Sequence, residues 1–276
     1  MKSRKVIAAA LLSTLSLSTN AQIMRIEMTG GKQMEIPVSS VVRISWYTNE
    51  PEETNPTTPD VSPSGVQTVD LGLPSGIKWA NMNVGAESPE DYGDYFAWGE
   101  TTGYKAGKKY FSEDRYKYFL KTTSATPDKD GFTTTTSGYT KYVTNSSYGY
   151  DGFYDNKTVL DPADDAATAN WGGSWRMPTK AEQDELRNNC TWEWAELKGV
   201  KGYKVTGSNG NFIFLPAAGY RYDSSSDDVG SGGGYWSSSL FSDYSSLAYE
   251  LYFGSSYVSS NYDVRHYGQS VRPVCP

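Results

Sequence analysis

The sequence predicts an α+β protein in which strands outnumber helices, with mixed or antiparallel sheets and about two helices. Hydrophobic content is modest at 37%, whereas the chain has 22 tyrosines and 8 tryptophans. This composition suits a sheet-rich domain, because aromatic residues are favoured in strands. Short apolar runs separated by Gly, Pro and Asn recur along the chain, as expected for strands joined by turns.

Residues 1–21 are predicted to be a signal peptide. Residues 2–5 are basic, residues 6–17 form an apolar core, and residues 19–21 offer a small-residue cleavage site before Gln22. The core is shorter than the roughly 18–20 residues that cross a membrane. We therefore expect an exported protein, whether periplasmic, on the cell surface or secreted, with no membrane insertion.

Residues 22–47 are predicted to form a small β-hairpin segment, and residues 48–65 a linker. In the first segment, alternating residues at 23–28 and 33–36 flank a Gly-Gly pair, which is a hairpin signal. Residues 41–46 predict a third strand. The linker has four prolines and several acidic residues, and such a composition favours an extended chain.

Residues 66–276 are predicted to form one domain. Strands are expected at 69–73 and 77–79, joined by a Pro-Ser-Gly turn. Residues 88–91 start with Ser and Pro, which are favoured at helix starts, and predict a short helix or a turn. Residues 101–158 are rich in Tyr, Thr and Lys with little periodicity, and are interpreted as a long irregular insertion with room for a hairpin.

The clearest helix signal follows Pro178. Thr179 and Glu182 have the spacing of a capping box, which predicts a helix that extends to Asn189. An Asn-Gly pair between two apolar runs then predicts a hairpin of residues 202–206 and 212–215. Three further strands are expected at 235–238, 248–253 and 270–274.

The charge of the chain disfavours nucleic acids and anionic membranes as partners. The net charge is −7 and falls to −10 once the three basic residues of the signal peptide are removed. Such an acidic surface repels phosphates.

The two cysteines, Cys190 and Cys275, predict one disulfide if the chain is in an oxidising compartment. A pair of thiols and a metal site remain as alternatives. With His266 as the one histidine, a four-ligand zinc site would also need carboxylates.

The segment from Tyr235 to Tyr267 has the composition of a binding surface. It has seven tyrosines, ten serines and no lysine. Tyrosine supplies rigid contact area, and Ser, Gly and Asn adapt their hydrogen bonds to a ligand. The alternative is that these strands merely cover a solvated sheet. The candidate ligand-binding residues are Tyr244, Tyr249, Tyr252, Tyr257, Asn261, Tyr262, Asp263, Arg265, His266 and Tyr267.

The sequence offers no convincing catalytic or metal site. His266 has no identifiable Ser and Asp partners for a triad. Carboxylate pairs such as Glu182 and Glu185 are better explained as charges near a helix N-terminus. Asp227 and Asp228 are the nearest substitutes for a calcium site, and they resemble solvated loop acids. We therefore expect a protein that is not an enzyme and has no cofactor and no metal.

Seven blocks of the domain resemble the Fibrobacter succinogenes major paralogous domain. In chain order they are residues 69–80, 83–86, 92–100, 171–179, 214–220, 235–239 and 270–274. The resemblance covers nearly all of 66–276 and is specific only as a set.

This resemblance implies a C-type lectin-like fold, related to the formylglycine-generating enzyme and to the variable proteins of diversity-generating retroelements. It also implies that the first and last strands of the domain pair. In the retroelement branch the variable surface precedes the closing strand, which corresponds here to residues 241–244, 249–252, 255–257 and 261–267.

The expected function is therefore non-catalytic binding of a ligand on the cell exterior through the Tyr/Ser-rich C-terminal face, which is a diversified surface if the retroelement likeness extends that far. The ligand is a protein or a glycan. The alternatives are a carbohydrate-binding module and a structural subunit of a cell-surface assembly.

Overall fold

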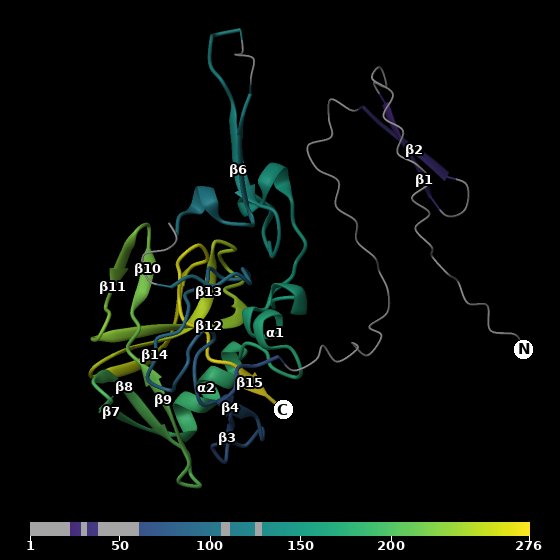
Figure 1. Cartoon of the computed structure of the whole chain (residues 1–276). Helices are drawn as coiled ribbons and strands as arrows, with labels where there is room; N and C mark the ends of the chain where they lie inside the picture. The colour runs from purple at the N-terminus through teal and green to yellow at the C-terminus, as the bar shows by residue number, and fades with distance from the viewer. Residues whose placement is uncertain (1–22, 29–31, 38–60, 106–110, 125–128) are drawn as a thin grey trace, which may run out of the picture. The chain divides into compact units, whose positions relative to one another are not determined.

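The computed structural model describes residues 23–28, 32–37, 61–105, 111–124 and 129–276. The predicted signal peptide, the strand expected at 41–46 and most of the linker lie outside these residues. The chain divides into two compact units, Met1–Asn55 and Pro56–Pro276. In the first unit β1 (Ile23–Met28) and β2 (Lys32–Pro37) pair antiparallel, which confirms the predicted hairpin (Figure 1).

The predicted α+β, C-type lectin-like fold class is wrong, because the structure is mostly antiparallel β-sheet. Strand accounts for 39% of it and helix for 14%. The described residues form several small sheets of two or three strands with two α-helices, and each named strand pair is antiparallel. Strands at 191–197 and 257–264, which the sequence did not predict, account for much of the difference.

The first and last strands of the second unit lie in one sheet. In it β4 (Lys78–Ala80) is flanked by β3 (Thr68–Asp70) and β15 (Val274–Cys275). Val274 is opposite Trp79, and it exchanges two backbone hydrogen bonds with Arg176. The first and last strands thus share a sheet as expected, but they do not pair directly: β15 pairs with the second strand, β4, and β3 lies on the other side of β4.

The helix predicted after Pro178 is confirmed as α2 (Lys180–Asn189). The Glu182 backbone N–H donates to the Thr179 hydroxyl, and the Thr179 N–H donates to the Glu182 carboxylate. The shorter α1 (Ala166–Trp171) begins after Asp165, whose carboxylate accepts from the Thr168 N–H. In both helices a side chain satisfies an N–H that has no partner within the helix.

Two three-stranded sheets and α2 share one part of the core. The predicted hairpin is present as β8 (Val200–Thr206) and β9 (Phe212–Pro216), joined by β7 (Thr191–Leu197) at its edge. The second sheet has the order β12 (Gly232–Leu240), β13 (Leu247–Gly254) and β14 (Tyr257–Val264). Leu186 of α2, Tyr203, Leu251 and Phe253 are buried together between these elements.

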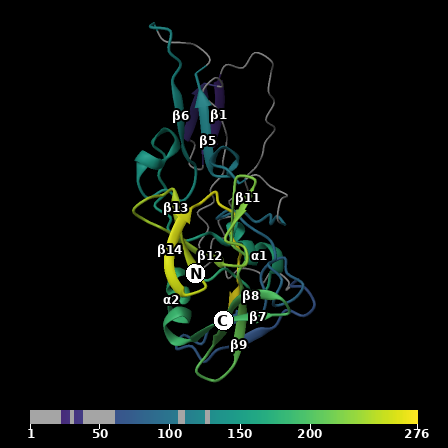
Figure 2. The same ribbon diagram turned by 90° about the vertical axis from the view of Figure 1, so that its left-hand side faces the viewer.

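A short hairpin lies beside the β12–β13–β14 sheet. It consists of β10 (Tyr220–Tyr222) and β11 (Ser225–Asp227), which pair antiparallel. Gly219 forms a bridge with Gly233, so β10 starts against the free edge of β12. Both views show the β10–β11 hairpin next to the sheet that carries β13 and β14 (Figures 1 and 2).

The insertion expected at 101–158 contains the hairpin of β5 (Phe119–Thr123) and β6 (Thr135–Tyr139). Short 3-10 turns accompany it, namely η2 (Glu113–Arg115), η3 (Ser146–Tyr148), η4 (Tyr150–Gly152) and the following η5 (Pro162–Asp164). Within the second unit, the hairpin extends away from the other sheets (Figure 2). Its base is nevertheless structural, since Tyr116, Tyr118, Tyr139 and Tyr142 are buried in the main core.

The predicted disulfide is not formed in the structure. Cys190 is the last cap residue of α2, whereas Cys275 lies in β15 opposite Lys78, and the two are not close. Burial raises the pKa of the Cys190 thiol to about 11. Among the described residues, no helix combines the length and the apolar character that a membrane crossing requires.

Candidate binding face

The register of β13 and β14 divides the predicted site residues between two sides of one sheet. Tyr252 is opposite Ser259, Glu250 opposite Asn261, and Ala248 opposite Asp263. Because side chains alternate along a strand, Tyr252, Asn261 and Asp263 share one side of the sheet. Tyr257, which is 50% exposed, lies at the end of the same side and its ring centre is 6.1 Å from that of Tyr252.

The neighbouring β10–β11 hairpin adds two tyrosines to this side. Tyr220 and Tyr222 alternate with buried Arg221, and both contact Tyr267, at ring-centre distances of 5.8 Å and 5.2 Å. Tyr252 Oη donates to Asp228, which follows β11. We call this surface the tyrosine face and define it as Tyr220, Tyr222, Asp228, Tyr252, Tyr257, Asn261, Asp263 and Tyr267.

Sequence reasoning missed Tyr220, Tyr222 and Asp228 as members of this surface. The alternation of Tyr220, Arg221 and Tyr222 is a strand pattern with two rings on one side. That signal was available in the sequence. What it does not give is the contact between this short strand and Tyr267, since the contact depends on how distant segments pack.

Three hydroxyl groups of the tyrosine face, those of Tyr220, Tyr252 and Tyr267, stay protonated at physiological pH. Burial raises the pKa of Tyr252, and its hydrogen bond to Asp228 raises it further. Burial and nearby carboxylates, Asp227 and Asp228 first among them, raise the pKa of Tyr220. Burial and the charge of Asp263 do the same at Tyr267. The face therefore presents neutral phenols as hydrogen-bond donors among carboxylates.

Buried polar groups lie directly beneath the tyrosine face. Glu250 is 2% exposed; its Oε1 accepts a 3.1 Å hydrogen bond from Asn261, and its Oε2 has no partner among the described residues. Gln269 is fully buried close by, and neither of its amide atoms has a partner there. The absence of a side chain at Gly234 leaves room for the Glu250 carboxyl, because a Cβ at that position would lie 2.9 Å from Glu250 Oε2.

The environment of these carboxyl groups changes their ionisation. Burial and then the charge of Asp263 raise the pKa of Glu250 to about 8. Burial raises the pKa of Asp263 to about 6. Glu250 is thus mostly protonated at neutral pH, while Asp263 is mostly ionised.

Three of the predicted residues, Tyr244, Tyr249 and Tyr262, lie elsewhere and contact one ring, that of Phe241. The Phe241 ring stacks on Tyr262 at 4.2 Å and on Tyr244 at 6.0 Å, and it meets Tyr249 edge-on at 5.2 Å. Lys180 of α2 lies over the Tyr249 ring. Tyr244 and Tyr262 remain 52% and 46% exposed, but their contacts with Phe241 also hold the 241–246 loop against β13 and β14, which gives the cluster a structural role.

The prediction that Arg265 contacts a ligand is wrong, because Arg265 is fully buried and belongs to no exposed surface. Its guanidinium donates to the backbone oxygens of Lys141, Tyr142 and Ser245 and to the Tyr116 hydroxyl. Five aromatic rings surround it at 4.7–6.0 Å, contributed by Trp98, Tyr116, Tyr118, Tyr139 and Tyr142. This cage anchors the end of β14 to the 101–158 segment.

His266 is half-buried and lies at the margin of the tyrosine face. Its ring meets Tyr267 edge-on at 5.2 Å, and its Nδ1 has no hydrogen-bond partner among the described residues. Burial lowers the pKa of the imidazole. In the described part of the chain, no three His, Cys, Asp or Glu side chains gather in a way that could hold a metal ion.

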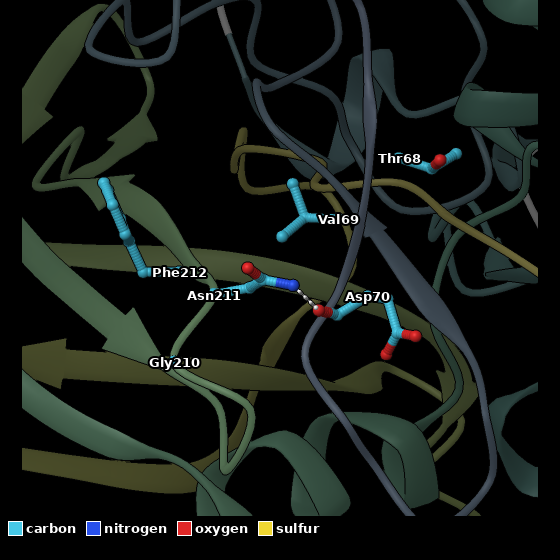
Figure 3. A pocket seen from close by; sticks show the side chains of 6 residues that line it. All are labelled: Thr68, Val69, Asp70, Gly210, Asn211 and Phe212. Carbon is cyan, nitrogen blue, oxygen red and sulfur yellow. Dashed lines mark hydrogen bonds between the residues drawn. The ribbon is translucent and has the colours of Figure 1, made fainter.

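A shallow pocket of about 490 Å³ lies between the end of β3 and the start of β9. It is lined by Thr68, Val69, Asp70, Gly210, Asn211 and Phe212 (Figure 3). The Asn211 amide donates to the Asp70 backbone oxygen at 2.9 Å, and the Asn209 amide donates to the same oxygen. These bonds tie β3 to the β8–β9 turn, and we interpret the pocket as a seam between elements.

Comparison with known proteins adds one match. Residues 195–274 match the model of a family described as a domain of unknown function (DUF8237). This segment runs from β7 to the start of β15 and contains every residue of the tyrosine face. No curated protein and no solved structure, C-type lectins included, matches the chain.

Proposed function

We propose that this protein is an exported, non-catalytic binding protein that holds a protein ligand on the tyrosine face. One observation carries the proposal. Five tyrosines from three separate segments, namely β10, β13–β14 and the loop after β14, gather on one surface. The opposite side of the β12–β13–β14 sheet packs on α2 and the β7–β8–β9 sheet, and among the five rings only that of Tyr267 packs against a buried core cluster.

Physical considerations support a role in recognition. Tyr222 and Tyr257 remain 43% and 50% exposed. Contiguous exposed aromatic surface marks interaction sites, and tyrosine is enriched in them because its ring is rigid and its hydroxyl bonds a partner.

The proposal is tested by selecting a displayed library of random twelve-residue peptides on the immobilised full chain. We expect enriched peptides whose binding falls at least tenfold when Tyr252 and Tyr257 are both changed to Ala. Tyr154→Ala, which removes a 59% exposed tyrosine of the 101–158 segment, is the matched control and should change nothing.

Two outcomes contradict the proposal. Equal enrichment on wild type and on the double variant would show that the tyrosines are not the site. Binding of glycans in place of peptides, with loss on the same double variant, would instead identify a carbohydrate-binding module.

The export that we propose has a separate test. Residues 2–21 have the basic, apolar and small-residue regions of a signal peptide. We expect the protein recovered from the periplasm, cell surface or medium of an expressing bacterium to begin at Gln22 by N-terminal mass analysis. Accumulation inside the cytoplasm with the first 21 residues intact would contradict export.

A further inference from the structure

The segment that contributes every residue of the tyrosine face, from residue 205 to the C-terminus, has carboxylates but no exposed cation. From residue 205 to the C-terminus the lysines and arginines number three, and each is an arginine. Arg221 is 3% exposed, Arg265 is fully buried, and Arg272 is 1% exposed. The same stretch has six acidic residues, namely Asp223, Asp227, Asp228, Asp243, Glu250 and Asp263.

The buried arginines do not neutralise these acids. Arg272 donates to Asn83 Oδ1 and to the backbone oxygens of Ala80 and Phe214. Arg265 donates to three backbone oxygens and one phenol. Arg221 lies over the Tyr95 ring and bonds Ser226. The three guanidiniums thus donate to neutral carbonyls, amides and hydroxyls, and in the described part of the chain none of these hydrogen bonds pairs an arginine with an acid of the face.

The rings and the carboxylates of the face are close enough to act on one group. The carboxylates that act most on the Tyr220 hydroxyl at neutral pH are those of Asp227, Asp228 and Asp263, because Glu250, the fourth acid near it, is mostly protonated there. Asp263 also acts on Tyr267, and Asp228 accepts from Tyr252. A cation placed over one of these rings is attracted by the ring quadrupole and by the neighbouring carboxylates together.

A second feature under the face points to a missing partner. Glu250 reaches Asn261, an exposed member of the face, and still leaves Oε2 without a hydrogen bond. Gln269 lies beside this carboxyl and lowers its pKa, yet its amide atoms have no well-formed hydrogen bond among the described residues. Buried polar atoms are normally satisfied, so unpaired ones directly below an exposed face indicate that a ligand group or water completes them.

We propose that the tyrosine face binds a basic segment of a protein partner, whose lysine or arginine side chains lie on its rings with their charges toward Asp228 and Asp263. This inference rests on the proposed function and adds the chemistry of the partner. Guanidinium groups suit the site especially, because they stack on aromatic rings and donate to carboxylates in the same plane.

The test uses three labelled twelve-residue peptides on one Gly-Ser scaffold, containing four Arg, four Gln or four Glu residues. Fluorescence anisotropy with the full chain at 50 mM NaCl should show the Arg peptide binding at least tenfold more tightly than the Gln peptide. The Glu peptide should not bind. Raising NaCl to about 300 mM should weaken the Arg peptide several-fold, because salt screens exposed charges.

Variants locate the binding site. Asp228→Asn with Asp263→Asn should weaken the Arg peptide about tenfold; Asn suits position 228, where φ is 59°. Asp243→Asn is the matched control, since this acid lies in the 241–246 loop outside the face. Tyr252→Ala with Tyr257→Ala should cause a similar loss, and Tyr257→Phe, which keeps its ring, should retain binding.

The outcomes separate this inference from the proposed function. Equal affinity for the three peptides would overturn the inference. It would also be overturned if neither the tyrosine variant nor the aspartate variant changed the affinity of the Arg peptide. If the random library yields neutral or acidic peptides that still require Tyr252 and Tyr257, the face binds protein ligands but its partner is not basic. Tyrosine-dependent binding of a glycan would overturn both.

Discussion

Arg265 has the neighbours of a core residue, although its sequence context is that of a surface strand. It stands between Asp263 and Tyr267, in a segment rich in Tyr, Ser and Asn. Its burial depends on rings that come from residues 98–142, far away in the sequence. Local composition cannot reveal such a cage, which is why the sequence placed Arg265 among the ligand contacts.

Replacing Arg265 should therefore reduce stability. Arg265→Lys keeps the charge but loses the planar fork that reaches three backbone oxygens. Each buried acceptor left unpaired costs about 1–3 kcal/mol, so we expect a loss of about 3 kcal/mol in urea unfolding. Arg187→Lys, at a half-exposed position of α2, should cost under about 0.5 kcal/mol. A loss below about 1 kcal/mol for Arg265→Lys would mean that the cage is not a source of stability.

Glu250 predicts a pH dependence of stability. Its pKa is about 8 in the fold and 4.5 in the unfolded chain. Between these values the folded state holds a proton that the unfolded state has released, so the contribution of Glu250 to stability is fully present below about pH 4.5 and is lost as pH rises to about 8. Asp263, the charged group that faces it, adds a smaller effect of the same sign because its pKa is also raised.

Glu250→Gln should flatten that profile. We expect the free energy of unfolding of wild type to fall on the order of a few kcal/mol from pH 5 to pH 8, and that of Glu250→Gln to change much less. Glu193→Gln, at an exposed position of β7, should keep the wild-type slope. The same slope in Glu250→Gln as in wild type would refute the role given to this carboxyl.

At the scale of elements, the sequence predicted correctly the helix and the hairpin that have clear local signals. The capping box at Thr179 and the Asn-Gly turn before Phe212 act within a few residues, and α2 and β8–β9 form as expected. Residues 257–264 and 191–197 have no comparable capping or turn signal in the sequence. They become strands because β13 and β8 offer them edges, which is a tertiary effect on a weak local preference.

The sequence also could not predict that the candidate site residues would be divided between the two sides of a sheet. A shift of one residue in the β13–β14 register would exchange Tyr262 with Asn261. Which tyrosines face a ligand is thus a property of the pairing.

This division predicts different effects for two exposed tyrosines. Tyr262, although 46% exposed, stacks on Phe241 at 4.2 Å, so Tyr262→Ala should cost about 1 kcal/mol or more of stability. Tyr257→Ala should cost little stability and should weaken ligand capture. Thermal melts and peptide binding measured on both variants test the contrast. The opposite pattern would show that the two sides of the sheet have been assigned the wrong way round.

At the scale of the whole second unit, two residues near the C-terminus connect segments that are distant in sequence. Arg272 bonds Ala80, Asn83 and Phe214, and Val274 pairs with Trp79 and Arg176. The pairing of the first and last strands was expected from the family resemblance. The lectin-like, α+β class inferred from the same resemblance was wrong, because sequence blocks can agree while the arrangement of sheets differs.

Deleting Val274–Pro276 should consequently destabilise the entire unit. It removes one fully buried valine, worth about 2 kcal/mol, and the paired hydrogen bonds with Arg176. We expect a loss of at least about 3 kcal/mol and a single, cooperative melt at lower temperature. Deleting exposed Pro276 alone should have almost no effect. A melt that leaves the tyrosine face intact while β15 is lost would contradict this view.

The arginine cage limits how the face could be transplanted. A fragment that starts at residue 195 would include every tyrosine of the face, yet it would leave Arg265 without a single one of its five rings. The fragment would also lack β4, the strand that pairs with β15. Transfer of this face to another protein, by engineering or by gene recombination, must therefore include about a hundred preceding residues as well.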